Sequence, residues 1–200
     1  MRFKLARTAL VAITVSFIGG SLTFADPLED AIKDIREKYK KIEEAKLPSE
    51  TMKWHPEDDI VSGTLTHYHS DGNLVKAHFS FGDGGHGEGD EYYYYWNGEC
   101  FFVFADHGYW KFTGRAKPDG QGETVDILFQ QRLYFKEGQL IRHLYKEGET
   151  TDPELRDQIM AATENSDRDD PEFAAQILLR ARRAAQATDP EDLKSIIDGP

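Results

Sequence analysis

Three histidines lie close together around one expected turn and are the first candidates for chemistry. Asp-Gly pairs suit two-residue hairpin loops, so Asp71-Gly72 predicts a hairpin between two β-rich segments. With regular antiparallel pairing around that turn, His67, His69 and His78 share one face of the sheet. Imidazole groups on neighbouring strand positions are a geometry that zinc can use, although Lys76 lies among them and would repel a cation. The pattern therefore predicts a zinc site, in a metal-binding protein or a metal-dependent hydrolase, or else a polar outer face of the sheet.

A glycine-rich segment, GDGGHGEGD at residues 82–90, offers a second kind of site. Its glycines match the spacing G-x-G-x-x-G, but a Tyr-rich strand follows instead of the helix that a dinucleotide site requires. Asp83, Glu88 and Asp90 would also repel phosphate. Carboxylate and carbonyl oxygens on a loop suit calcium, so a calcium site is kept beside the simpler interpretation of a loop between strands.

The third candidate is the aromatic run EYYYYWNGECFFVF at residues 91–104. Asn97-Gly98 predicts a hairpin turn, and regular pairing makes both faces of this hairpin apolar. One face then holds Tyr92, Tyr94, Trp96, Phe101 and Val103, and the other holds Tyr93, Tyr95, Cys100, Phe102 and Phe104. We expect a central hairpin that is covered on both sides. Tyr92, Tyr94 and Trp96 form either plain core or a binding surface for a protein or for a stacking ligand such as a sugar.

Nothing in the sequence groups a nucleophile, a base and an orienting acid. There is no Gly-x-Ser-x-Gly elbow. Cys100 is the single cysteine, so no intramolecular disulfide can form, and its place in an aromatic strand predicts a buried thiol. The sequence therefore nominates no catalytic residue and predicts a protein that is not an enzyme.

The element before the strands is predicted with most support from the residues. Five apolar side chains follow one another at spacings of four and three residues and form one helical stripe. They are Leu28, Ile32, Ile35, Tyr39 and Ile42. Asp26 is expected to cap this helix, with Pro27 at its first position. The stripe must be covered, either by the following sheet or by a second copy in a coiled coil.

From about residue 60 to residue 145 the apolar period changes to two, and the turn dipeptides recur in HSDGNLVK, YWNGECFFV and FKEGQLIRH. Three successive hairpins predict an antiparallel β-meander, so we expect an α+β domain over residues 26–148. Beyond it, three segments begin with Asp-Pro and continue in helix formers. Residues 149–200 are therefore expected to be a helical, partly mobile extension, with Phe173, Ile177 and Leu178 as its packing face.

The chain begins with the pattern of a secretory signal peptide. Residues 1–25 contain basic residues, then a short apolar run, then small residues ending at Ala25. Loss of the three basic residues would take the formal charge from -12 to -15, since the segment has no acidic group. Such a charge excludes nucleic acid and anionic membranes as favoured partners. We expect an exported protein, periplasmic or secreted, with no integral membrane segment after cleavage.

The export pattern, the helix IREKYKKIEE and the hairpins EYYYYWNGECFFVF and QRLYFKEGQLIRHL together resemble a group of small exported bacterial proteins of unknown role with Tyr/Phe-rich hairpin repeats. The likeness covers about residues 30–146, and it implies the fold without implying a catalytic residue. A weaker likeness to Tyr-x-x-Gly-x-Leu arrays of the MORN or antitoxin kind is limited by the unequal spacing of the hairpin glycines. The sequence thus favours an exported, non-catalytic binding or interaction module with a protein or glycan partner, and a metal protein using the histidines is the alternative.

Overall fold

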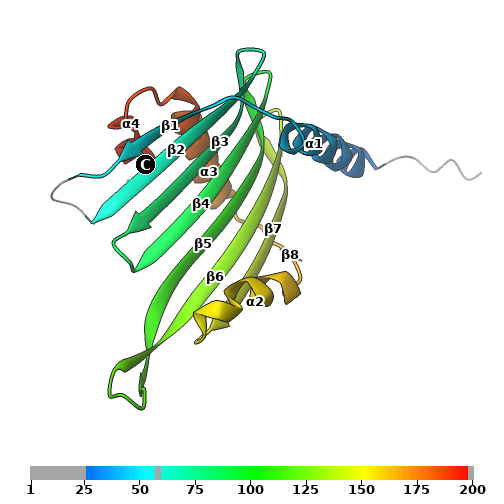
Figure 1. Cartoon of the computed structure of the whole chain (residues 1–200). Helices are drawn as coiled ribbons and strands as arrows, with labels where there is room; N and C mark the ends of the chain where they lie inside the picture. Colours follow the sequence, from blue (N-terminus) through cyan, green and yellow to red (C-terminus); the bar gives the residue numbers. More distant parts are fainter. Residues whose placement is uncertain (1–25, 57–59, 198–200) are drawn as a thin grey trace, which may run out of the picture.

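A computed structural model of the chain describes residues 26–56 and 60–197, so the expected signal peptide lies outside the described residues. The fold is one open, eight-stranded antiparallel sheet with helices on both sides (Figure 1), which confirms the predicted α+β meander. The strands are β1 (Ser49–Trp54), β2 (Val61–Ser70), β3 (Asn73–Asp83), β4 (Gly87–Trp96), β5 (Glu99–Ala116), β6 (Gly122–Lys136), β7 (Gln139–Thr150) and β8 (Ser166–Asp167). The helices are α1 (Pro27–Glu43), the short 3-10 helix η1 (Pro153–Leu155), α2 (Arg156–Ala162), α3 (Pro171–Gln186) and α4 (Asp192–Ile197).

Helix α1 begins and packs largely as its sequence predicts. The Asp26 carboxylate accepts a hydrogen bond from the backbone N–H of Leu28 at 3.0 Å, and Pro27 is the first helical residue. The middle of the predicted stripe is buried against β5 and β6, where Ile32 is fully buried. The other two residues named here stay exposed: Tyr39 is 37% exposed and Leu28 is 40% exposed. The sheet of the same chain is therefore the partner of this helix.

The opposite face of the sheet is covered by α3 and α4. Their buried side chains share one cluster with Leu65, Phe79 and Tyr93 from the strands. Asp170 caps α3 by accepting a hydrogen bond from the backbone N–H of Phe173 at 3.0 Å, as the Asp-Pro pattern predicts. The packing face of α3 is the predicted one and includes Ile177, which is fully buried. The C-terminal helices thus belong to the same core as the meander.

Helix α2 lies on the same face of the sheet as α1, farther along the strands (Figure 1). It packs against Gly148 of β7, where any side chain would collide with Ile159. Arg156, at the start of α2, makes ion pairs with Asp126 at 2.8 Å and with Glu88 at 2.6 Å. Between α1 and α2, the half-buried strand residues Tyr92, Phe104, Asp106 and Gln130 lie on the same face of the sheet as these helices and are called the open floor below. None of the described helices is both long enough and apolar enough to cross a membrane.

The three predicted hairpins share a unit that consists of a turn and a β-bulge. Asp71-Gly72, Asn97-Gly98 and Glu137-Gly138 all have positive φ, from 51° to 82°, as two-residue hairpin loops require. Three residues after each glycine the pairing register shifts, which leaves one extra residue on the returning strand. The extra residues are Val75, Phe101 and Ile141, and all three pack in the cluster beneath α1. Because the register shifts, positions beyond each bulge lie on the opposite face from the one that regular pairing predicts.

Candidate functional site

The bulge after Asp71-Gly72 removes the predicted zinc cluster. His67 lies opposite Ala77, and His78 lies opposite Thr66, so His78 is on the α1 face while His67 is on the α3 face. The expectation that His67, His69 and His78 share a face was therefore wrong, because Val75 adds one residue to β3. Within residues 26–56 and 60–197, no three His, Cys, Asp or Glu side chains are arranged to hold a metal ion.

His67 instead joins the sheet to α3. Its side chain is 8% exposed, and its Nε2 lies 2.6 Å from the backbone carbonyl of Ala184. A carbonyl oxygen can only accept, so Nε2 carries the proton in this contact. Burial lowers the pKa of His67, because the charged imidazolium would lose its hydration under the helix. The histidine therefore acts as a neutral structural donor.

The glycine-rich segment, for which a calcium site was kept beside a simple loop between strands, is a tight hairpin between β3 and β4. The Asp83 carboxylate accepts hydrogen bonds from the backbone N–H groups of His86, at 2.9 Å, and Gly87. One of its oxygens is thus occupied by the turn itself. Asp90 lies within β4 and is bonded to His78 at 2.6 Å. The carboxylate of Asp83 therefore stabilises the turn, and that of Asp90 joins β4 to His78 of β3.

Helix α1 divides the predicted aromatic surface into three different environments. Tyr94 lies beneath the helix and is only 2% exposed, with its hydroxyl donating to Glu43 at 3.1 Å. Trp96 is half-buried on one side of the helix, with the ammonium groups of Lys41 and Lys38 at 5.3 and 5.6 Å from its ring. Tyr92 is half-buried on the other side, on the open floor. None of the three lines the groove described below, although Tyr92 lies beside its wall residue Phe104.

Because of the bulge at Phe101, the two faces of this hairpin differ from those that regular pairing predicts. Tyr94 lies opposite Phe102, and Tyr92 lies opposite Phe104, so both phenylalanines are on the α1 face. Val103 lies opposite Tyr93 and belongs to the core beneath α3. The sequence-based register placed these three residues of β5 on the reverse faces. Aromatic side chains therefore gather more densely beneath and beside α1 than regular pairing predicts.

A row of stacked side chains crosses four strands beside α1. The His78 ring lies 4.2 Å from the Tyr92 ring at an interplanar angle of 7°, and Tyr92 stacks on Phe104 at 5.9 Å. The guanidinium of Arg132 then lies 4.9 Å from the centre of the Phe104 ring. His78 and Tyr92 thus stack closely, whereas Tyr92 and Phe104 lie farther apart.

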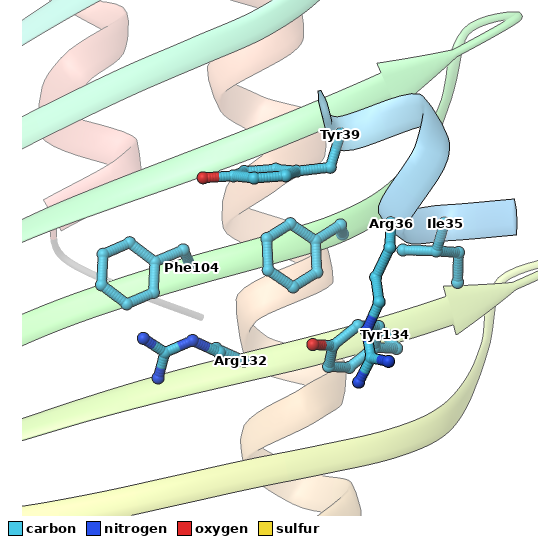
Figure 2. Close-up of a pocket in the computed structure, with 7 residues that line it drawn as sticks. Ile35, Arg36, Tyr39, Phe104, Arg132 and Tyr134 are labelled. Atoms are coloured by element: carbon cyan, nitrogen blue, oxygen red, sulfur yellow. The ribbon is translucent and has the colours of Figure 1, made fainter. Parts of the chain in front are cut away.

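The row leads into a groove between α1 and the sheet, of about 210 Å³ (Figure 2). The groove is lined by Ile35, Arg36, Tyr39, Phe102, Phe104, Arg132 and Tyr134. Ring edges pack around it: Tyr39 meets Phe102 edge-on at 5.4 Å, and Phe102 lies 5.0 Å from Tyr134. Aromatic walls and a basic group at each side make a site suited to a flat apolar group.

The two arginines of the groove lack carboxylate partners. Among the described residues, neither Arg36 nor Arg132 has an acidic group within ion-pair distance. Other arginines do have such partners, namely Arg115, Arg142, Arg156, Arg168 and Arg180. Arg132 is held in place by a hydrogen bond from its Nη1 to the side-chain oxygen of Asn165 at 3.0 Å. The groove is therefore locally basic in an acidic chain.

Polar groups continue the floor from the groove towards α2. Asp90 lies opposite Asp106, which lies opposite Gln130, and the Gln130 amide donates to Asp106 at 2.7 Å. The hydrogen bond from His78 lowers the pKa of Asp90, whereas burial raises the pKa of Asp106. Lys146 of β7 donates to the carbonyl of Met160 in α2. These contacts occupy much of the polar row.

Cys100 is a poor nucleophile where it stands. Burial raises the pKa of its thiol to about 12, so the thiolate is scarce near neutral pH. Its Sγ lies 3.7 Å from the carbonyl of Phe102, and the side chain contacts the cluster beneath α3. The thiol therefore packs as a small apolar group, as its strand position predicts.

The sequence alone did not reveal Arg36, Phe104 or Arg132 as parts of a site. The sequence feature that could have pointed to Arg36 is its place directly after a buried position of the α1 stripe. The pairing of Phe104 with Arg132 depends on the β5–β6 register, and the sequence does not mark the irregularity in that register between Phe112 and Ala116. Comparisons with protein-family models, curated proteins and solved structures found no match. The function is therefore argued from this geometry.

Proposed function

We propose that this chain is an exported, non-catalytic binding module, and that its ligand inserts a flat apolar group into the groove between α1 and the sheet. The observation that carries the proposal is the preformed cavity of about 210 Å³, walled by Tyr39, Phe102, Phe104 and Tyr134. Ligand sites are typically concave and lined mostly by apolar and aromatic side chains, with a few polar groups that orient the ligand, and this groove has that composition.

The size of the groove limits what enters it. An engineered apolar cavity of roughly 150 Å³ holds benzene, whereas sites for drug-sized ligands measure roughly 300–1,000 Å³. A cavity of about 210 Å³ therefore suits one ring with one substituent. The inserted group belongs to a small molecule or to the end of a larger partner, and in both cases a single ring is the part that is bound.

The walls of the groove are rigid, which favours binding without rearrangement. Phe102 is 6% exposed and Tyr134 is 5% exposed, so core packing fixes the position of these two walls of the groove. Tyr39 rests edge-on against Tyr94 at 5.0 Å and is the exposed wall. A ligand would therefore order few side chains on binding, and it would lose little affinity to conformational entropy.

A fragment experiment tests the proposal. A library of single-ring compounds is screened by ligand-observed NMR against the chain that begins at Asp26, and the hits are repeated with Phe104→Ala and Phe112→Ala. Phe104 forms a wall, whereas Phe112 is 64% exposed on the β5–β6 ribbon and serves as a matched control. We expect hits that are lost with Phe104→Ala and kept with Phe112→Ala. A screen with no hits, or hits equally kept by both variants, would reject the groove as the site.

Export is tested separately. The proposal expects that expression of the full sequence in a bacterial host gives a chain outside the cytoplasm whose first residue is Asp26, because small residues end at Ala25. N-terminal sequencing after cell fractionation measures this. An uncleaved chain in the cytoplasmic fraction would remove the exported part of the proposal and leave the groove unaffected.

A further inference from the structure

The charges around the groove point to the chemistry of its ligand. The chain has 36 acidic and 24 basic residues, so a guanidinium without a carboxylate nearby is unexpected by chance. Arg36 and Arg132 nevertheless line the same groove and have no ion-pair partner within the described part of the chain. Two acidic groups in this part of the fold are engaged elsewhere, since Glu43 binds Lys76 at 2.6 Å and Asp106 accepts a hydrogen bond from Gln130. Two guanidinium groups are thus available to a ligand.

The surroundings of Arg132 strengthen this basic character. Arg132 is half-buried, and its hydrogen bond to Asn165 and its stacking on Phe104 fix its guanidinium at the groove. The pKa of Lys146 on the adjacent strand is lowered, mainly by burial and then by the positive charge of Arg132. Packing therefore holds the positive charge of Arg132 near that of Lys146. The resulting free-energy cost of repulsion and burial would be offset by a bound anion.

The aromatic walls favour the same kind of ligand. Tyr39 meets Phe102 edge-on at 5.4 Å, so ring edges as well as ring faces line the groove. Ring edges carry the positive end of the aromatic quadrupole and attract electronegative oxygens. Guanidinium groups add a planar fork of N–H donors that matches a carboxylate or a phosphate.

We infer that the ligand of the groove is a single-ring or similarly flat apolar group that carries an oxyanion, with the ring between Tyr39, Phe102 and Tyr134 and the oxyanion at Arg36 and Arg132. The inference rests on the proposed function, because it names the ligand class of the same groove. Carboxylate and phosphate share the required chemistry, and the net charge of -12 of the whole chain disfavours the binding of such anions elsewhere.

The test compares four probes on the chain that begins at Asp26 by isothermal titration and ligand-observed NMR. Benzoate has the ring and the charge, benzamide has the ring alone, acetate has the charge alone, and phenyl phosphate exchanges the head group. We expect benzoate or phenyl phosphate to bind at least tenfold more tightly than benzamide or acetate, since charge-assisted hydrogen bonds are among the stronger ones. Their affinity should fall in high salt, whereas benzamide should be insensitive.

Two substitutions locate the charge. Arg36→Gln and Arg132→Gln should each weaken benzoate or phenyl phosphate about tenfold and leave benzamide unchanged. Arg115→Gln is the matched control, because Arg115 is exposed, pairs with Glu123 at 2.8 Å and lies on the β5–β6 ribbon. Circular dichroism of each variant checks that the fold is kept. Arg36 is exposed on α1, so its variant is expected to fold even if Arg132→Gln does not.

The outcomes separate the inference from the proposed function. If benzamide binds as tightly as benzoate and phenyl phosphate, and Phe104→Ala abolishes the binding of all three, the groove is a binding site but the inferred need for an oxyanion is rejected. If acetate binds as tightly as benzoate, the ring plays no part and the inferred ligand class is wrong. If no ring compound binds at several millimolar, the proposed function and the inference both fall.

Discussion

Replacement of Glu91 by Gln should destabilise the protein severely, because Glu91 is an acidic side chain with no solvent exposure beneath α3. Its carboxylate forms an ion pair with Arg180 Nη1 at 2.9 Å, and it accepts hydrogen bonds from His107 Nε2 at 2.9 Å and from the Tyr93 hydroxyl. Gln has nearly the same shape but no charge. The Arg180 guanidinium, 17% exposed, would then be buried without a counter-charge.

The expected cost follows from that loss. Removing one partner of a buried ion pair costs roughly 3–5 kcal/mol, a large part of the 5–15 kcal/mol that holds a typical domain together. Arg180 has little capacity to compensate, since its Nε already lacks a hydrogen-bond partner among the described residues. Removing both charges should cost less than removing one. The double variant Glu91→Gln/Arg180→Met is therefore expected to recover much of the lost stability, because Met can pack where the Arg180 stem lies against Phe81.

Urea unfolding followed by tryptophan fluorescence measures these free energies. Asp34→Asn is the control, because it breaks the exposed pair with Lys38 on α1 and should change the free energy of unfolding by less than about 1 kcal/mol. A Glu91→Gln variant that loses less than about 1 kcal/mol, or a double variant less stable than the single one, would refute the claim that Glu91 is held as a paired charge.

Three further changes test other parts of the fold. Ile32→Ala should cost roughly 2–5 kcal/mol, because Ile32 is fully buried between α1 and the sheet; thermal unfolding measures this, and a cost below about 1 kcal/mol would mean that α1 is not docked. Gly89→Ala should cost roughly 1–3 kcal/mol, because the new methyl carbon would lie 2.5 Å from the Phe81 ring; urea midpoints show the loss, and a neutral result would contradict the close approach. Burial lowers the pKa of His67 and His143, so the unfolded chain takes up protons first as the pH falls below about 6.5, and the free energy of unfolding should decrease from pH 7.5 to pH 5.5. His67→Gln should flatten that pH dependence in urea titrations, and an unchanged slope would show that His67 does not titrate as its burial implies.

The parts of the fold that depend on neighbouring residues could be predicted from the sequence. Asp71-Gly72, Asn97-Gly98 and Glu137-Gly138 form the expected turns because Gly, Asn and Asp tolerate the positive φ that such turns impose. The helix caps at Asp26 and Asp170 likewise depend on residues within three positions. These signals are local, so they can be recognised without the rest of the chain.

The faces of the strands could not be predicted, because a β-bulge has no marker as clear as Asn-Gly. One extra residue, Val75 or Phe101, reverses the face of every position that follows it. Without the bulges, the predicted register put His78 on the same face as His67 and put Phe104 on the opposite face from Tyr92, and the structure reverses both placements. A comparison of the three hairpins does give a signal: an aliphatic or aromatic residue stands three positions after each turn glycine, where regular alternation expects the other face.

The groove itself depends on distant segments and was beyond sequence reasoning. Arg36 comes from α1, Phe104 from β5 and Arg132 from β6, and the side chain of Arg132 is oriented by Asn165, which follows α2. No local pattern joins these positions. The aromatic character of the region was evident, but the division of Tyr92, Tyr94 and Trp96 by the helix requires the docked position of α1.

The order of the strands has a consequence for how the chain folds. Each of the seven ladders joins strands that follow one another in the sequence, from β1–β2 to β7–β8. Contacts close in sequence favour fast folding, so the sheet can grow one hairpin at a time without waiting for distant segments. The contacts of α3 with β3 and of α4 with β1 and β2 span much of the chain and can form only after the C-terminal residues are available. During synthesis, which begins at the N-terminus, the chain would therefore carry a nearly complete sheet with one uncovered apolar face until α3 and α4 pack against it.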